Sequence, residues 1–233
     1  MNGALYSSAL LAIGGTDGGT ILPRWFGALP RLGIREAYLF WAVPNQADVS
    51  APLDQLAADA KRWSAQLDSL GIRSELCLKR GVPGPWLTAL AGIYHADLIV
   101  LGAPIQPKSR AETLSYLLDN LKRPLLVLPG GDSPADPNLL SRALIDRSSS
   151  EEGRQHIQLL AEHAGEVREL DVTAFGTGRA ARAAAKLATD IGASIIVLAQ
   201  SAREIAGPLA QFAGLPLLIL PEPRPMSRRV GRE

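Results

Sequence analysis

A glycine-rich string near the start of the chain has the residue types that could bind an anion. Gly14-Gly15-Thr16-Asp17-Gly18-Gly19-Thr20 follows a short apolar run and precedes a helical pattern. Glycines let backbone N–H groups approach a phosphate, and the N-terminus of a following helix adds positive potential. The string lacks the Gly-Lys-Ser/Thr ending of a P-loop. It is also typical of a turn in which Thr16 or Asp17 caps the next helix, and both interpretations stay open.

Two further polar strings precede predicted helices. Gly176-Thr177-Gly178-Arg179-Ala180-Ala181 fits the G-x-G-x-x-A dinucleotide pattern, but the acidic residue expected about 20 positions later is missing. Ser148-Ser149-Ser150-Glu151-Glu152 is typical of a helix cap with acidic residues in the first turn. A phosphate contact by these hydroxyl groups is the alternative.

The residues suited to metal or covalent chemistry are few. His156 and His163 lie on one predicted helix, seven positions apart, whereas a metal pair prefers positions i and i+4. His95 precedes a strand and has no triad partner in the sequence. The single cysteine, Cys77, lies in an apolar stretch that indicates a small buried thiol. We therefore expect no catalytic residue and no metal site.

The composition is typical of a soluble globular protein. Of 233 residues, 47% are hydrophobic and 20% are charged, and the formal net charge of +1 argues against nucleic acid as a partner. We expect no transmembrane helix, because no apolar run reaches about 18 residues. The start lacks the features of a signal peptide, so the expected location is the cytoplasm.

Short apolar runs alternate with longer helical stretches along the chain, a pattern that predicts a parallel sheet covered by helices on both faces. The expected strands cover 9–13, 37–43, 72–78, 97–101, 125–128, 143–145, 167–174, 195–199 and 217–220. The expected helices cover 53–70, 86–94, 111–121, 150–163, 179–191 and 202–212.

The chain contains an internal repeat. The string at 96–102 (ADLIVLG) matches 193–199 (ASIIVLA), and the string at 123–129 (RPLLVLP) matches 215–221 (LPLLILP). The second copy is shorter by one helix and one strand. We predict a complete domain over 1–131, a linker over 132–141, a truncated domain over 142–223 and a basic flexible tail over 224–233.

The repeated strings, in this order and spacing, resemble the universal stress protein family over nearly the whole chain. The resemblance implies an α/β fold: two open parallel-sheet units of the adenine nucleotide alpha hydrolase-like, Rossmann type in tandem, the second one smaller. It also implies dimers or tandem pairs. We expect an internal pseudo-dimer of the two repeats that meet through 125–128 and 217–220, and a homodimer is a further alternative.

In this family, members that bind ATP carry G-x2-G-x9-G followed by Ser or Thr, and an acidic residue at the end of the first strand. Gly102 matches the first glycine, but Ile105 takes the place of the second, and Ala111 and Glu112 take the place of the Gly-Ser pair. The second copy keeps an acid, Asp146. The candidate nucleotide-binding positions are Gly14, Gly15, Thr16, Asp17, Val43, Gly102, Ala103, Asp146 and Ser148.

The resemblance and these departures together predict a non-enzymatic stress-response module with a degenerate nucleotide site and an unidentified protein client. The alternative is a module that binds ATP or another adenine nucleotide through its first domain and hydrolyses ATP slowly. A third hypothesis is an accessory domain that regulates a transporter or a kinase.

Overall fold

The computed structural model describes residues 4–13, 18–43, 50–103, 107–130, 137–146, 151–171 and 177–221. Its strands are β1 (Ser8–Ala12), β2 (Glu36–Val43), β3 (Arg73–Arg80), β4 (Leu98–Gly102), β5 (Leu125–Leu128), β6 (Arg142–Asp146), β7 (Glu166–Leu170), β8 (Ile195–Ala199) and β9 (Leu217–Leu220). Its helices are α1 (Gly18–Trp25), α2 (Ser50–Ser69), α3 (Pro83–Ile93), α4 (Pro107–Asp119), α5 (Glu151–His163), α6 (Thr177–Asp190) and α7 (Arg203–Phe212). Two 3-10 segments, η1 (Phe26–Leu32) and η3 (Gln200–Ala202), follow α1 and β8.

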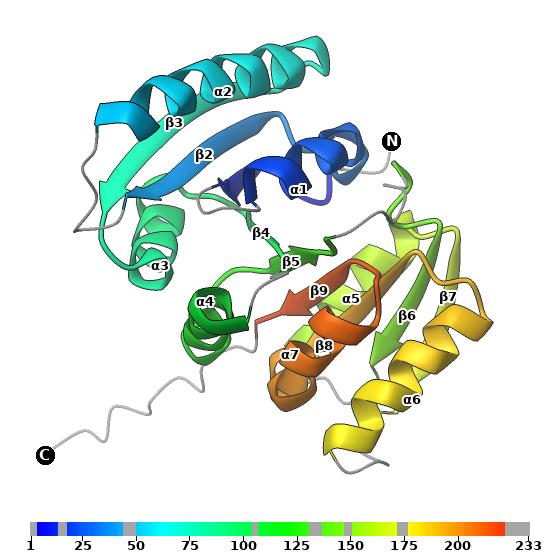
Figure 1. Ribbon diagram of the computed structural model, residues 1–233. Helices are drawn as coiled ribbons and strands as arrows, with labels where there is room; N and C mark the ends of the chain where they lie inside the picture. Colours follow the sequence, from blue (N-terminus) through cyan, green and yellow to red (C-terminus); the bar gives the residue numbers. More distant parts are fainter. Residues whose placement is uncertain are drawn as a thin grey trace, which may run out of the picture.

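All nine described strands form one sheet in the order β3-β2-β1-β4-β5-β9-β8-β6-β7 (Figure 1). Neighbouring strands are parallel within each half of the chain. The halves join where β5 and β9 pair antiparallel, with Leu126 opposite Leu218. Because of this one antiparallel pair, the carboxyl ends of the strands lie at opposite edges of the sheet in the two halves.

The two halves repeat one topology, and the second half is smaller, as the sequence predicts. The first half has the order β3-β2-β1-β4-β5, and the second has β7-β6-β8-β9 in the same sense. The second half has no described counterpart of β3 or of α2. The strands expected to bring the halves together do so edge to edge, so the halves share one sheet instead of packing one sheet on another.

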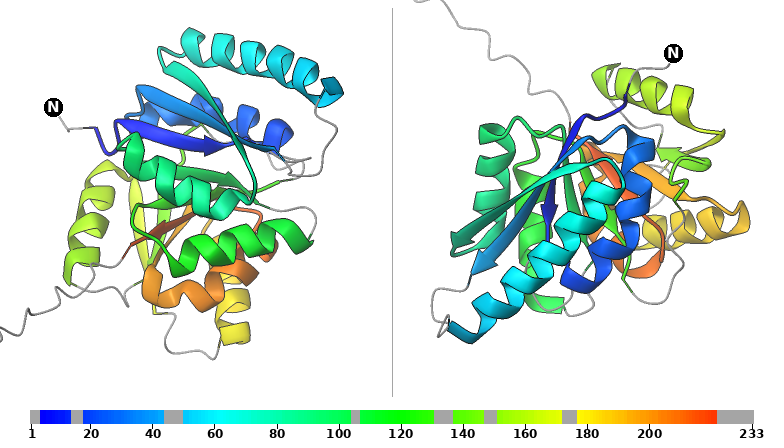
Figure 2. Two further views of the ribbon diagram at one scale, coloured as in Figure 1. Left: turned by 90° about the vertical axis from the view of Figure 1, so that its left-hand side faces the viewer. Right: turned by 90° about the horizontal axis from the view of Figure 1, so that it is seen from above.

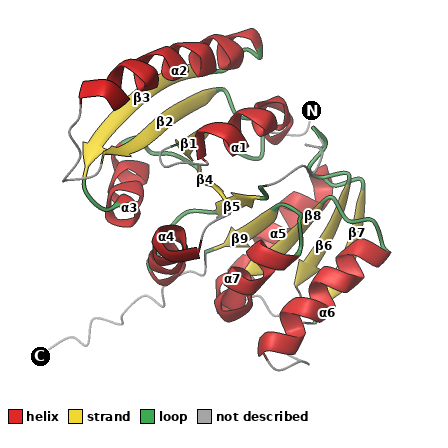
Figure 3. Ribbon diagram, viewed as in Figure 1, coloured by secondary structure: helices red, strands yellow, loops and turns green. Residues whose placement is uncertain are grey.

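Helices cover both faces of the sheet (Figures 2 and 3). Side chains alternate along each strand, so Leu10 enters one core with α3, α4, α6 and α7, and Leu11 enters the other with α1, η1, α2 and α5. Each core runs through both halves of the sheet. The joined sheet therefore lies between two continuous apolar layers.

Proline sets the start of two helices. The predicted helices begin at 86 and 111, whereas α3 begins at Pro83 and α4 begins at Pro107. Proline suits the first turn because its missing N–H would have no helical partner there and its φ is already helical. The predicted strand at 167–174 corresponds to β7, which covers Glu166–Leu170, and residues 172–174 of the prediction lie outside the described part.

A carboxylate ties β1 to β4 at the amino ends of these strands. One oxygen of Asp97 (Oδ2) accepts hydrogen bonds from Ser7 N at 2.9 Å, Ser7 Oγ at 2.6 Å, Ser8 N at 3.2 Å and Ser8 Oγ at 3.3 Å. Burial raises the pKa of Asp97, but these hydrogen bonds outweigh it and hold the pKa below its ordinary value. In the second half Ser194 makes the equivalent tie, because its hydroxyl accepts a hydrogen bond from Arg142 N of β6 at 2.9 Å.

Candidate functional site

The described candidate residues of the first half lie at the carboxyl ends of β2 and β4, on either side of β1. The order β2-β1-β4 places β1 between the other two strands, and the chain leaves β1 and β4 toward opposite faces. Open α/β sheets bind ligands at such a switch point. Val43 ends β2, and Gly102 and Ala103 end β4, so the structure brings these three residues to one edge.

The side chain of Ile21 borders the space beside Gly102 and leaves room there for little more than a methyl group. A Cβ added at Gly102 would lie 3.4 Å from three side-chain atoms of Ile21, in the first turn of α1. Ile21 is itself buried, with 3% of its surface exposed. A phosphate that approached the Gly102 backbone from this side would have to displace an apolar side chain. The sequence did not single out Ile21, although it is the first apolar residue after the glycine string.

The neighbouring backbone groups already have partners within the sheet. Ala103 N donates to Leu128 O at 2.6 Å, at the end of β5. Val43 O accepts from Gly81 N at 3.0 Å. Both side chains are buried, with exposures of 4% for Ala103 and 9% for Val43. These two positions therefore present little polar surface to a ligand.

Several predicted site residues lie outside the described part of the chain: Gly14, Gly15, Thr16, Asp17 and Ser148. Residues 104–106 of the loop after β4 lie outside it too. The positions of the expected Gly-Ser pair are described, and Ala111 and Glu112 belong to α4. Residues that would belong to a longer phosphate loop are thus part of helix α4.

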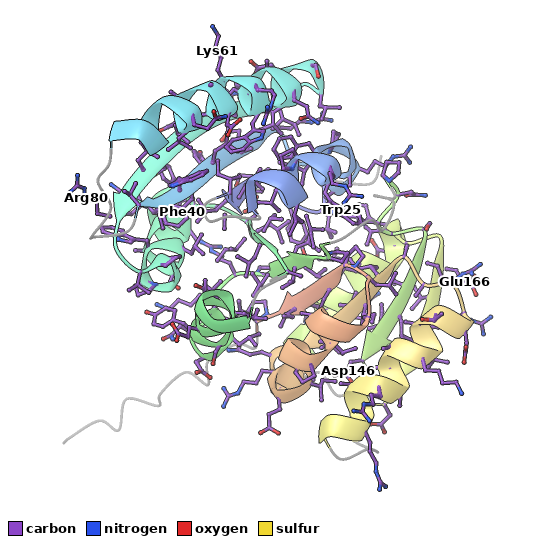
Figure 4. All side chains as sticks on the ribbon, viewed as in Figure 1. Trp25, Phe40, Lys61, Arg80, Asp146 and Glu166 are labelled. Atoms are coloured by element: carbon purple, nitrogen blue, oxygen red, sulfur yellow. The ribbon has the colours of Figure 1, made fainter. Side chains whose placement is uncertain are left out.

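The acid of the second half lies at the opposite edge of the sheet. Asp146 ends β6 and is 1% exposed, and Figure 4 shows it inside the fold. Val43, Gly102 and Ala103 lie in the other half of the joined sheet, at its opposite edge. The sequence-predicted positions therefore belong to two sites instead of one. A buried carboxylate at a strand end can bind a ligand or can serve the fold through its existing contacts.

The loop after β8 contacts the other half of the chain. Strand β8 leads directly into η3 and α7, and Gln200 Nε2 donates to Leu118 O of α4 at 2.9 Å. Arg203 Nη1 lies 3.8 Å from Asp119 Oδ1 across the same contact. The segment that corresponds to a phosphate loop therefore helps to join α7 to α4. The sequence did not predict this contact of Gln200 and Arg203 with α4, because no local pattern indicates a contact between repeats.

The shifted titratable groups lie elsewhere. A hydrogen bond with Cys77 and burial raise the pKa of Tyr94 to about 12. Tyr94 stacks on Tyr38 with ring centroids 4.2 Å apart, near the amino ends of β2 and β3. Among the described residues, no group of three or more His, Cys, Asp or Glu side chains could hold a metal ion. In the same part of the chain, no helix has the length and apolar character needed to cross a membrane.

The comparisons with known proteins find similarity in structure. No protein-family model and no curated protein matches the sequence. A universal stress protein from Archaeoglobus fulgidus matches with a TM-score of 0.70 and 12% identity over 92% of this chain and 96% of its own. The cytoplasmic domain of a prokaryotic cation chloride cotransporter matches with a TM-score of 0.50 and 13% identity over 93% of this chain and 95% of its own.

A third match covers about half of this chain. A universal stress protein family protein from Arabidopsis thaliana with AMP bound has a TM-score of 0.41 and 14% identity over 56% of this chain and 98% of its own. The full-length match to the Archaeoglobus protein agrees with the repeated strings and the strand order described above. The chain therefore has the universal stress protein fold, with a complete first unit and a smaller second one.

Proposed function

We propose that this protein is a non-enzymatic universal-stress-type module that acts through protein contacts and whose nucleotide site is degenerate. The observation that carries this proposal is the packing of Ile21 on Gly102, with Ile21 atoms 3.4 Å from a Cβ built there. Gly102 is the one position of the first copy that keeps a motif glycine. Its use in a phosphate site depends on open space beside its backbone.

The other potential phosphate donors support the same proposal. Ala103 N already donates to Leu128 O, and the loop after β8 is engaged with α4 through Gln200. We propose that the two halves act together as an internal pseudo-dimer. The antiparallel β5–β9 pair and the α4–α7 contact support this arrangement. The exposed surface of the joined sheet and its helices would then contact the client.

Nucleotide titration tests the proposal. We expect that ATP, ADP and AMP at millimolar concentration leave the Tm unchanged and give no binding heat in calorimetry. A nucleotide present at 100 times its Kd would stabilise the native state by about 2.7 kcal/mol, and the resulting rise in Tm is readily measured. A saturable rise in Tm with any of the three nucleotides, or phosphate release from ATP above the buffer rate, would contradict the proposal.

The variant Ile21→Ala distinguishes two hypotheses: a nucleotide site that is intact but covered by Ile21, and a site that can no longer bind nucleotide. The substitution removes most of the side chain above Gly102 and leaves the glycine in place. We expect it to lower stability by about 2–5 kcal/mol, as for other buried truncations, without creating nucleotide binding. Leu22→Ala, at an equally buried neighbouring position of α1, is the matched control for the loss of stability. Tight ATP binding by the Ile21 variant alone would show that the site is only covered.

The second candidate function is binding of an adenine nucleotide, with slow hydrolysis of ATP. The position of Asp146 at the carboxyl end of β6 favours it, because the chain leaves β6 and its neighbour β8 toward opposite faces of the sheet there. In this case Asp146→Asn should weaken a measured nucleotide affinity at least tenfold. An unchanged affinity in this variant would place the ligand in the first half.

A further inference from the structure

Strand β3 forms one end of the joined sheet. In the described part of the chain β2 is its one strand neighbour, and all eight residues of β3 pair with β2 (Figure 1). Helix α2 runs along one face of this strand in each view (Figure 2). The other edge of β3 therefore carries backbone groups that a further strand could pair with.

The hydrogen bonds to β2 identify which groups these are. Arg73 N donates to Arg35 O at 2.9 Å, and Gly81 N donates to Val43 O at 3.0 Å. Because residues alternate along a strand, the odd-numbered positions turn their N–H and C=O groups toward β2. The even-numbered positions turn theirs toward the outer edge: Ser74, Leu76, Leu78 and Arg80.

The side chains of β3 are self-complementary about Cys77. If a second β3 lies antiparallel with Cys77 opposite Cys77, each Glu75 faces Lys79 and each Leu76 faces Leu78. Leu78 is 42% exposed and is one of the few large hydrophobic side chains on the described surface. Figure 4 shows the nearby Arg80 projecting away from the body of the protein.

Other registers are less favourable. With Leu76 opposite itself, Arg73 would face Lys79, a pair of like charges. With Leu78 opposite itself, Glu75 would face Gly81 and lose its ionic partner. The register centred on Cys77 is thus the one in which both charges and both leucines find partners. In it the even-numbered positions of the two strands also face each other, as their outward N–H and C=O groups require.

We propose that β3 is the contact strand of a symmetric dimer, in which it pairs antiparallel with β3 of a second copy about a two-fold axis at Cys77. The pairing supplies about eight hydrogen bonds between backbones, two for each facing pair of even-numbered residues. It also forms two Glu75–Lys79 pairs and covers Leu78. An edge contact alone buries less than the roughly 800 Å² per partner of a stable interface, so the dimer is weak, with a Kd of about 1–100 µM.

The opposite end of the sheet does not have this pattern. Strand β7 has five residues, and Glu166 N donates to Ser141 O, so only Val167 and Glu169 turn toward the outer edge. Glu166 already bonds Arg142 Nε at 2.7 Å and Arg168 Nε at 3.0 Å. On β3, Glu75 accepts only a long hydrogen bond from Tyr94 Oη at 3.5 Å, and Lys79 Nζ lies 5.4 Å from the centroid of the Trp86 ring. Because β3 also turns four residues toward its outer edge and β7 turns two, we assign the dimer contact to β3.

A proline substitution at the outer edge of β3 tests the pairing. Leu78→Pro removes an N–H that faces the outer edge, so the β2–β3 ladder keeps its hydrogen bonds. In sedimentation velocity over about 1–300 µM, a range around the expected Kd, we expect the wild type to pass from monomer to dimer and Leu78→Pro to stay monomeric. Val167→Pro, at the equivalent kind of position on β7, is the matched control and should dimerise as the wild type does.

Charge reversal tests the register. Glu75→Lys and Lys79→Glu should each weaken the dimer at least tenfold, and the double variant should restore a Kd within about threefold of the wild type, because like charges face each other only in the single variants. This test stands even if the proline variant fails to fold. A wild type that is monomeric up to the highest concentration, or single variants that dimerise as well as the wild type, would overturn the proposal.

Discussion

Gly84 is a position where one added methyl group brings two opposing effects into play. It lies in the first turn of α3, where alanine would ordinarily stabilise the helix over glycine by about 0.5–1 kcal/mol. A Cβ at Gly84, however, would lie 2.8 Å from Cδ1, 3.0 Å from Cγ and 3.1 Å from Cβ of Tyr116 on α4. These atoms include the root of the tyrosine side chain, so a change of rotamer cannot relieve the whole overlap.

The magnitude follows from the two terms. Non-bonded carbon atoms prefer about 3.5–4.0 Å, so Gly84→Ala forces α3 and α4 apart by several tenths of an ångström. Overpacking of this kind costs about 1–3 kcal/mol, which exceeds the gain in helix propensity. We therefore expect a net loss of about 0.5–2 kcal/mol. For a protein of this size, the loss lowers the Tm by roughly 1–8 °C.

Gly92→Ala is the matched control, because Gly92 lies in the same helix and has nothing within 4 Å of its built Cβ. Thermal and urea unfolding followed by circular dichroism should show a raised midpoint for Gly92→Ala and a lowered one for Gly84→Ala. Adding Tyr116→Ala removes the contact, so Gly84→Ala should cost little in that background. If Gly84→Ala stabilised the wild type as much as Gly92→Ala does, the close approach of α3 to α4 would be wrong.

The remaining predictions concern Asp97, His95 and Gly192. Asp97→Ala removes the acceptor for Ser7 and its neighbour and should lower the free energy of unfolding by about 1.5–3 kcal/mol. The pKa of Asp97 is lower in the folded state than in the unfolded state, so the ionised carboxylate stabilises the fold above about pH 4. This stabilisation is lost as the pH falls through the folded pKa. The difference in Tm between Asp97→Ala and the wild type should therefore shrink in acid. His95 has a φ of +51°, at the end of α3 that corresponds to Gly192 with a φ of +63°, so His95→Gly should raise stability by up to about 1 kcal/mol and Gly192→Ala should lower it. Chemical unfolding measures both, and a loss of stability in His95→Gly would contradict the strain argument.

Much of the fold follows from local pattern. Buried runs such as 97–101 and 195–199 predict strands because both faces of a covered parallel sheet must be apolar. The repeated strings also indicate that the second copy is shorter, because fewer residues precede them in the second copy than in the first. The predicted helix starts are less accurate, since Pro83 and Pro107 begin helices that the apolar spacing alone would start later.

The candidate site depends on contacts that no local pattern contains. The motif departures at Ile105 and Glu112 are visible in the sequence, but the packing of Ile21 on Gly102 is a tertiary contact between residues 81 positions apart. The sequence also gives no sign that Asp146 and Gly102 lie at opposite edges of one sheet. That separation results from the antiparallel β5–β9 pair, which reverses the second half relative to the first.

The β5–β9 pair also has a consequence for how the chain is made. Strand β5 consists of four apolar residues, and its free edge is covered when β9, from the far end of the described chain, arrives. During synthesis the first half can fold while the edge of β5 still lacks its partner, and such an edge is a template for association with other chains. We expect this stage of biogenesis to be the one most dependent on chaperones, and truncation before Leu217 to give a chain that aggregates.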